Sequence, residues 1–222
     1  MKNDGLESQT STRAAVSAGV KFANQQERVG TFGPRAGIHL SFAQIPRRRV
    51  NFMDLKDTFR FVAPSVREAA QKTAAQLDHL GIRHALAGGL AVGAHGYIRA
   101  TTDVDFLVGE EAFDHQGLLV AFKAGVPIEV GGIRIDYLSP VALGSQLEED
   151  LNHPQTSEGL AVVSIESLIY MKLVAKRRKD LLDVVELIKA GADAASVRSY
   201  LNQYAADLIS LFDELVNEAL TE

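Results

Sequence analysis

The pattern of apolar and polar residues divides the chain into three parts. Residues 1–52 are rich in Ser, Thr, Gln, Asn, Gly and Arg, show no sustained strand or helix period, and are predicted to be a disordered extension. Because helical patterning begins near Met53, a natural translation start at that methionine is a second explanation for the atypical segment. Residues 53–160 alternate strand-like and helix-like segments, whereas residues 161–222 show helical patterning alone.

The predicted core begins with an amphipathic helix over residues 65–81, SVREAAQKTAAQLDHLG, whose apolar residues recur at helical spacing up to a cap at Gly81. A glycine pair, Gly131-Gly132, marks the turn of a later hairpin. The other segments predicted here are a short buried strand (82–88), a helix of small residues (89–97), a second strand (102–108) and that hairpin (127–139). The predicted fold class is therefore α+β, α/β-like in its alternation, with a small mixed β-sheet core packed with helices.

Helices alone are predicted in the C-terminal part of the chain. The segment 164–191 has a helix-capping start at Ser164 and a glycine stop at Gly191, which predicts one long helix. Residues 193–220 are predicted to form one or two further helices. The mixed core is therefore followed by a helical C-terminal region.

The composition indicates an ordinary globular protein. A chain of 222 residues, 46% hydrophobic and 23% charged, is long enough to bury one core. The absence of cysteine excludes disulfides, thiol nucleophiles and cysteine-ligated zinc, and fits a reducing compartment. The formal net charge of −5 argues against a broad nucleic-acid-binding surface, and no apolar run approaches the roughly 20 residues that span a bilayer. We therefore expect a cytoplasmic protein without a membrane partner.

Two aspartates, Asp103 and Asp105, interrupt an apolar strand. Side chains two residues apart in a strand share a face, so these carboxylates are predicted to point the same way. Together they would repel each other and lose hydration, and a divalent cation such as Mg²⁺ or Mn²⁺ would offset both penalties. The solvated face of an edge strand produces the same alternation, so this pair alone leaves both interpretations open.

A glycine pair strengthens the interpretation as a site. Gly88 and Gly89 fall at the predicted strand-to-helix junction, where the missing side chains allow backbone N–H groups to approach a phosphate. Their spacing matches neither the Walker pattern nor G-x-G-x-x-G, and a tight turn would explain the pair equally well. A third carboxylate, Asp136, lies among apolar neighbours on another predicted strand. Alone, Asp136 would be typical of a paired structural aspartate.

In combination these residues resemble the signature of the DNA polymerase β-like nucleotidyltransferase superfamily. The stretch AGGLAVGAHGYIRATTDVDFLV, residues 87–108, has a glycine pair that opens a helix, then D-x-D on the next strand, with one more acid downstream. The stretch LIYMKLVAKRRKDLLDVVEL, residues 168–187, is similar to the downstream helix of small bacterial and archaeal members, especially the AbiEii-type toxin branch. The resemblance implies a nucleotidyltransferase core.

For the core residues, the resemblance implies a division of labour. Gly88 and Gly89 would bind the triphosphate of an NTP, while Asp103 and Asp105 would hold the metal ions. Asp136 would be a third metal ligand or the base that activates the acceptor hydroxyl.

For the downstream helix, the resemblance implies that Lys172 reaches the phosphates and that Asp180 and Asp183 orient this lysine or line the acceptor side. Lys172, Lys176 and Lys179 are spaced by four and three residues, which places them on one face of the predicted continuous helix. The competing interpretation is a solvent-facing ladder of ion pairs without a role in binding.

Three further features carry predictions. Arg99 is a candidate partner for Asp103 or for phosphate, and both remain open. His95 is predicted to be a buried, hydrogen-bonded structural histidine, because no second histidine completes a ligand pair. The segment 109–132 is short for the superfamily, which predicts an abbreviated intervening helix.

The implied activity is transfer of a nucleoside monophosphate from an NTP to an acceptor, with release of pyrophosphate. The acceptor stays open between tRNA, another protein and a small molecule, and the branch implies a toxin of a toxin–antitoxin system with a cognate antitoxin. A non-catalytic nucleotide-binding or interaction protein that keeps the fold is the alternative. The presence of all three acids, Asp103, Asp105 and Asp136, favours the enzyme.

Overall fold

The computed structural model describes residues 55–117 and 119–221. The predictions of a disordered extension over residues 1–52 and of a translation start at Met53 lie outside these residues. Within the described part, none of the helices has both the length and the apolar character needed to cross a membrane.

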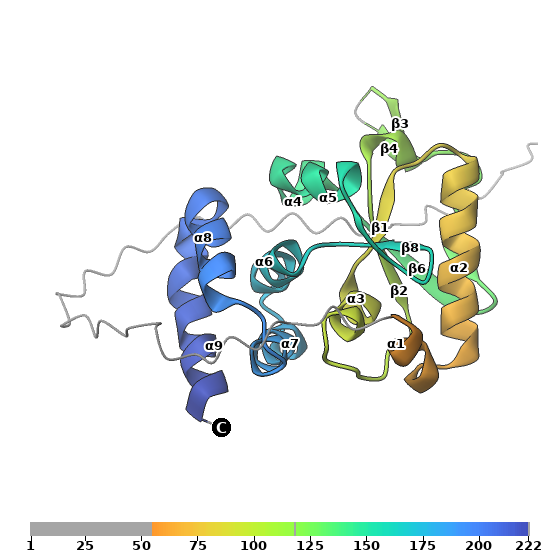
Figure 1. Cartoon of the computed structure of the whole chain (residues 1–222). Coiled ribbons are helices and arrows are strands. Elements are labelled where there is room, and N and C mark those ends of the chain that lie inside the picture. Colours follow the sequence, from red (N-terminus) through yellow and green to blue (C-terminus); the bar gives the residue numbers. More distant parts are fainter. Residues whose placement is uncertain (1–54, 118, 222) are drawn as a thin grey trace, which may run out of the picture. The chain divides into compact units, whose positions relative to one another are not determined.

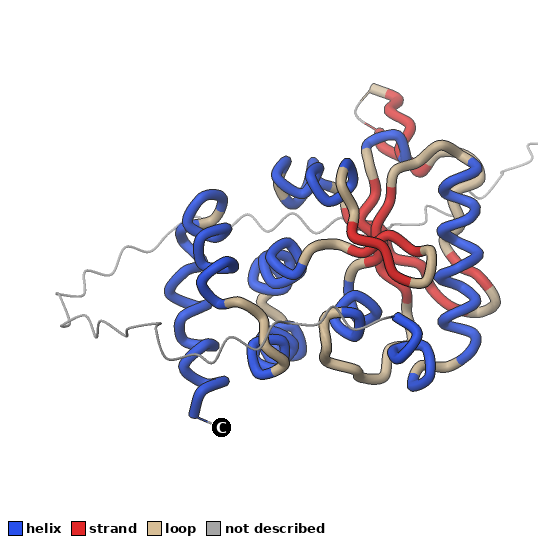
Figure 2. The backbone as a smooth tube through the Cα atoms, viewed as in Figure 1, coloured by secondary structure: helices blue, strands red, loops and turns tan. Residues whose placement is uncertain are grey.

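A six-stranded mixed sheet forms the centre of the described part (Figure 2). Its strand order is β5-β6-β2-β1-β8-β7. The β2–β6 and β1–β8 pairs are parallel, and the β1–β2, β5–β6 and β7–β8 pairs are antiparallel. The strands are β1 (His84–Leu86), β2 (Val104–Val108), β5 (Glu129–Val130), β6 (Ile133–Leu138), β7 (Gln155–Ser157) and β8 (Leu160–Val162). The predicted small mixed sheet is confirmed.

Helices cover both faces of this sheet (Figure 1). Helix α2 lies on one side, and α3, α6 and α7 lie on the other, with α8 and α9 packed beyond them. The helices are α1 (Leu55–Phe61), α2 (Pro64–His79), α3 (Gly88–Ala94), α4 (Pro140–Leu143), α5 (Glu148–Asn152), α6 (Ile165–Ala175), α7 (Arg178–Lys189), α8 (Ala194–Tyr204) and α9 (Ile209–Thr221). The α+β fold class is therefore confirmed, including the helical character of the described C-terminal part.

The core follows the apolar spacing of the sequence. Val66 and Leu77 on α2 and Phe106 on β2 are fully or almost fully buried, because the apolar stripe of the helix packs on the sheet. After α2 the chain turns at Gly81, whose φ of +68° is the left-handed conformation that favours glycine. The β5–β6 hairpin turns at the predicted Gly131-Gly132 pair.

The prediction of one long helix over residues 164–191 is wrong. Helix α6 ends at Ala175, and Lys176 adopts a left-handed backbone with φ +52° before α7 begins. A left-handed non-glycine residue costs about 1–2 kcal/mol, which contacts elsewhere must offset. The break lets α7 fold back beside α6 (Figure 1). The lysines at 172, 176 and 179 therefore do not share one helical face.

The intervening helix of segment 109–132 is abbreviated, as predicted, to a short 3₁₀ turn. This segment contains a 3₁₀ turn (Glu110–Ala112) and a separate two-stranded hairpin, β3 (Phe113–Gln116) and β4 (Leu119–Phe122). The ring of Phe113 stacks on that of Phe122 at 5.4 Å between centroids, which ties the two strands together.

Candidate active site

Three carboxylates gather on one face of the sheet. Strands β2 and β6 are parallel, and their register places Asp105 directly opposite Asp136. Asp103 precedes β2 by one residue and lies two positions before Asp105. Because side chains two apart share a face, the strand pairing carries all three acids to the same place.

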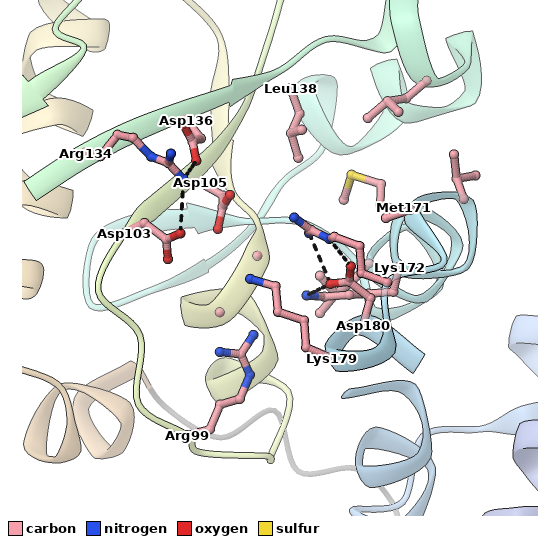
Figure 3. Close-up of a pocket in the computed structure, with 17 residues that line it drawn as sticks. Arg99, Asp103, Asp105, Arg134, Asp136, Leu138, Met171, Lys172, Lys179 and Asp180 are labelled. Carbon is pink, nitrogen blue, oxygen red and sulfur yellow. Dashed lines mark hydrogen bonds and ion pairs between the residues drawn. The ribbon is translucent and has the colours of Figure 1, made fainter. Parts of the chain in front are cut away.

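The acids line a pocket of about 180 Å³ between strands β2 and β6 on one side and helices α6 and α7 on the other (Figure 3). Eight residues that sequence reasoning selected for the site line this pocket: Gly88, Gly89, Arg99, Asp103, Asp105, Asp136, Lys172 and Asp180. Asp183, which the resemblance also selected, does not line it. Part of the wall is apolar and includes Leu138 and Met171. The structure thus brings the selected residues together, whereas their roles stay predictions.

The glycine pair is fitted closely to the acids. Gly88 has φ +54°, and a Cβ added there would lie 1.7 Å from Oδ2 of Asp105. A Cβ on Gly89 would lie 2.7 Å from Oγ1 of Thr101. Thr101 in turn donates a hydrogen bond of 3.0 Å to Oδ1 of Asp103. The absence of side chains at 88 and 89 therefore leaves room for the acids themselves.

Gly88→Ala should damage both backbone and site. We expect a loss of about 1–3 kcal/mol from the left-handed backbone, and in addition a displaced Asp105 carboxylate. Gly131→Ala is the matched control, because Gly131 has a similar φ of +59° and nothing within 4 Å of an added Cβ. Urea unfolding should show the larger loss for Gly88→Ala, and equal losses in the two variants would contradict the close contact with Asp105.

An arginine that sequence reasoning missed lies between two of the acids. The Arg134 guanidinium pairs with Asp136 at 2.7 Å and approaches Asp103 to 3.6 Å, while the side chain is 69% exposed (Figure 3). The signal was present, because Arg134 stands two residues before Asp136 on the same strand and so shares its face. Thr101, which hydrogen-bonds Asp103, was given no role from the sequence either.

Within the cluster of three acids, Asp105 has a raised pKa. Burial raises its pKa, and the neighbouring carboxylates of Asp103 and Asp136 raise it further, while Lys172 and Lys179 lower it. Asp105 therefore favours its protonated form more than an ordinary aspartate does.

This raised pKa predicts a pH-dependent stability. Because folded Asp105 binds its proton more tightly than the unfolded chain does, its contribution is complete below the usual aspartate pKa and is lost as pH rises through the raised value. Asp105→Asn lacks that loss, so the free energy of unfolding of the variant, relative to that of wild type, should increase as pH rises above about 4. Urea titrations in EDTA would measure this difference, and a difference independent of pH would contradict the raised pKa.

The carboxylates of Asp103, Asp105 and Asp136 share a face and are suitable ligands for a hard divalent cation, but side chains would have to move before they could bind one. No three His, Cys, Asp or Glu side chains within 55–117 and 119–221 are grouped closely enough to hold a metal ion as they stand. Arg134 supplies positive charge between Asp103 and Asp136 instead. A cation therefore requires this exposed arginine to move aside.

A buried network of charges occupies the helical side of the pocket. The Lys172 amine, on a residue only 5% exposed, donates to Asp180 at 2.9 Å and to Asp183 at 2.7 Å. Arg99 donates to both oxygens of Asp183, at 2.7 and 2.9 Å, and Arg177 pairs with Asp180. Of the two partners left open for Arg99, Asp103 is therefore not the one found, because two of the guanidinium hydrogen bonds go to Asp183 and a third goes to the carbonyl oxygen of Ala100.

The alternative of a solvent-facing ion-pair ladder on this segment is contradicted. Asp180 is 0% and Asp183 1% exposed, so both acids belong to the interior rather than to a solvated face. Burial raises the pKa of Asp180, but hydrogen bonds from Arg177 and Lys172 outweigh it and hold the pKa below the usual value. This carboxylate is therefore charged and paired inside the protein.

His95 has the structural role that the sequence predicts. Its residue is 3% exposed, and Nε2 lies 2.8 Å from the carbonyl oxygen of Val163. Burial lowers the pKa of His95, which favours the neutral ring. The histidine thus links α3 to the end of β8.

Comparisons with known proteins leave the family open. No family model matches the sequence, and no curated protein matches it significantly. Among solved structures, the chain is similar to the crystal structure of an antigenic nucleotidyltransferase-like protein from Paracoccidioides brasiliensis, with a TM-score of 0.39 and 16% identity, over 72% of this chain and 93% of that one. The chemistry of the pocket therefore has to follow from its own side chains.

Proposed function

We propose that this protein is a metal-dependent nucleotidyltransferase, which moves a nucleoside monophosphate from an NTP to an acceptor and releases pyrophosphate. The observation that carries the proposal is the register of β2 and β6, which sets Asp105 opposite Asp136 beside Asp103, at a pocket that also holds the glycine pair. An acid such as Asp105, whose pKa is raised by burial and by the two acids beside it, is typical of a functional site.

Each side chain has a task in this proposal. Asp103 and Asp105 would hold Mg²⁺ or Mn²⁺, which when bound would stabilise the charge that develops on the reacting phosphate. Asp136 would complete the ligand set or accept the proton of the acceptor hydroxyl. The backbone N–H groups of Gly88 and Gly89, at the start of α3, would donate hydrogen bonds to phosphate oxygens. In reactions of the phosphoryl-transfer type, the protein contributes mainly by positioning the reacting groups and stabilising their charge.

A non-catalytic nucleotide-binding protein is the second candidate, and one observation favours it. Arg134 bridges Asp103 and Asp136 where a cation would be needed. An arginine that stayed there in the presence of nucleotide would neutralise the acids without supporting transfer. The toxin role and the cognate antitoxin, which rest on the resemblance of residues 168–187 alone, stay predictions.

Transfer of label tests the proposal directly. The protein is incubated with each α-³²P-labelled NTP, Mg²⁺ and total cellular RNA, protein or small-molecule extract, and each fraction is examined for label. We expect one fraction to acquire label only when Mg²⁺ is present, which also identifies the acceptor class and the preferred base. Nucleotide binding without transfer in any fraction would favour the second candidate, and absence of nucleotide binding would overturn both.

A further inference from the structure

Five basic side chains line the pocket, and four of them are already paired with acids. Arg134 pairs with Asp136, and the other three belong to the buried network described above. These three are Arg99, Lys172 and Arg177. The positive charge of a basic side chain that lies within about 3 Å of a carboxylate is largely offset by that carboxylate. Separating the two would leave a buried acid without a partner, which is unfavourable. The three cations of the buried network are therefore poor candidates for binding an incoming anion, and Arg134 is paired with the acids that would hold the metal.

Lys179 is the fifth, and its surroundings differ. It is exposed, it lines the pocket, and neither a hydrogen bond nor an ion pair to it is found among the residues that the structure describes. Its amine points from the first turn of α7 toward Asp105 (Figure 3), the acid that lies against Gly88. The lysine is also close enough to lower the pKa of Asp105. An unpaired cation thus faces the acids and the glycine pair from across the pocket.

The buried network fixes the direction of this lysine. Asp180 follows Lys179 directly and is anchored by Lys172 and Arg177, so the first turn of α7 cannot rotate without breaking those pairs. Consecutive residues on a helix point about 100° apart, and an inward Asp180 leaves Lys179 at the pocket wall. The left-handed Lys176, which ends α6, sets where this turn begins.

We propose that Lys179, rather than Lys172, is the side chain that binds the triphosphate. Lys172 is paired with the buried acids Asp180 and Asp183. Lys179 is exposed, so its ammonium group can exchange bound water for phosphate oxygens with little rearrangement of the protein. The ligand class is a polyphosphate chain, recognised by charge and independently of base or sugar. This inference rests on the proposed function, because it assigns the lysine that meets the NTP in the same site.

Inorganic triphosphate with Mg²⁺ is the probe, because it lacks base and sugar. Its dissociation constant is measured by calorimetry for wild type, Lys179→Ala and Lys176→Ala, and the KM for the labelled NTP is measured in parallel. Lys176 is the matched control, being an exposed lysine three positions away that does not line the pocket. We expect Lys179→Ala to weaken triphosphate binding about 10- to 100-fold, as the loss of a charge-assisted hydrogen bond does, and Lys176→Ala to stay within about 2-fold of wild type.

The outcomes separate this inference from the function on which it rests. Wild type that binds neither triphosphate nor NTP would overturn both. Binding by wild type that Lys179→Ala leaves unchanged, or that both lysine variants weaken equally, would overturn only the assignment of Lys179. Lys179→Arg should recover most of the affinity, and an arginine variant as weak as alanine would also contradict a charge contact. Because Lys179 is exposed, thermal unfolding of all variants should coincide with wild type.

Discussion

The double variant Asp103→Asn, Asp105→Asn should lose nucleotide transfer by about 1,000-fold or more while remaining folded. Asparagine keeps the shape of each side chain but removes the negative charge that would hold the cation. The fold should tolerate the change, because Asp105 gives up a charge that burial and its neighbours already disfavour. Transfer of label measures the activity, and circular dichroism checks the fold. Asp114→Asn, at an exposed aspartate on β3, is the control.

A second measurement on the same variants addresses binding rather than turnover. Mg²⁺ together with NTP should raise the melting temperature of wild type, because a ligand that binds only the folded state stabilises it. The double variant should show no such shift. If it transferred nucleotide at a rate near that of wild type, the assignment of Asp103 and Asp105 as metal ligands would be wrong.

Lys172→Met should lower the free energy of unfolding by about 3 kcal/mol, at the lower end of the range for breaking a buried ion pair. The reason is that Asp180 and Asp183 would each lose a buried partner, although Arg177 and Arg99 would remain beside them. Urea unfolding measures the loss, and Lys176→Met, at an exposed lysine, should leave stability nearly unchanged.

A double-mutant cycle shows whether this loss comes from the ion pair. Combining Lys172→Met with Asp183→Asn should return a coupling energy of about 1–3 kcal/mol, as directly interacting side chains do. Additive effects of the two substitutions would mean that the network contributes nothing beyond packing. The resemblance implies that Lys172 affects phosphate binding, whereas the burial of Lys172 predicts that its replacement first lowers the free energy of unfolding.

The sheet side of the site was predictable because its determinants are local. The alternation through Asp103 and Asp105 fixes which side chains share a face, and the glycine pair marks the turn that the acids require. Arg134 could have been found by the same two-residue rule applied to Asp136.

The helical side was not predictable in the same way, because tertiary contacts decide it. Lysine is a good helix former, so nothing in the local sequence marks Lys176 as the residue that takes a left-handed backbone. The break brings Asp180 and Asp183 to Lys172, and that contact exists only once the chain has folded back. Asp183 also binds Arg99, which therefore does not pair with Asp103, the candidate that is close to it in sequence.

Because the link between α6 and α7 is short, the number of residues in it matters as much as which residues they are. An insertion of a single residue between Lys176 and Asp180 would turn the start of α7 by about 100° and shift it along its axis by about 1.5 Å. The acids would then point away from Lys172 and the pocket lysine away from the sheet, although no side chain had been replaced. The length of this link is therefore part of the site, and a sequence that kept every pocket residue but changed the link by one would not be expected to keep its chemistry.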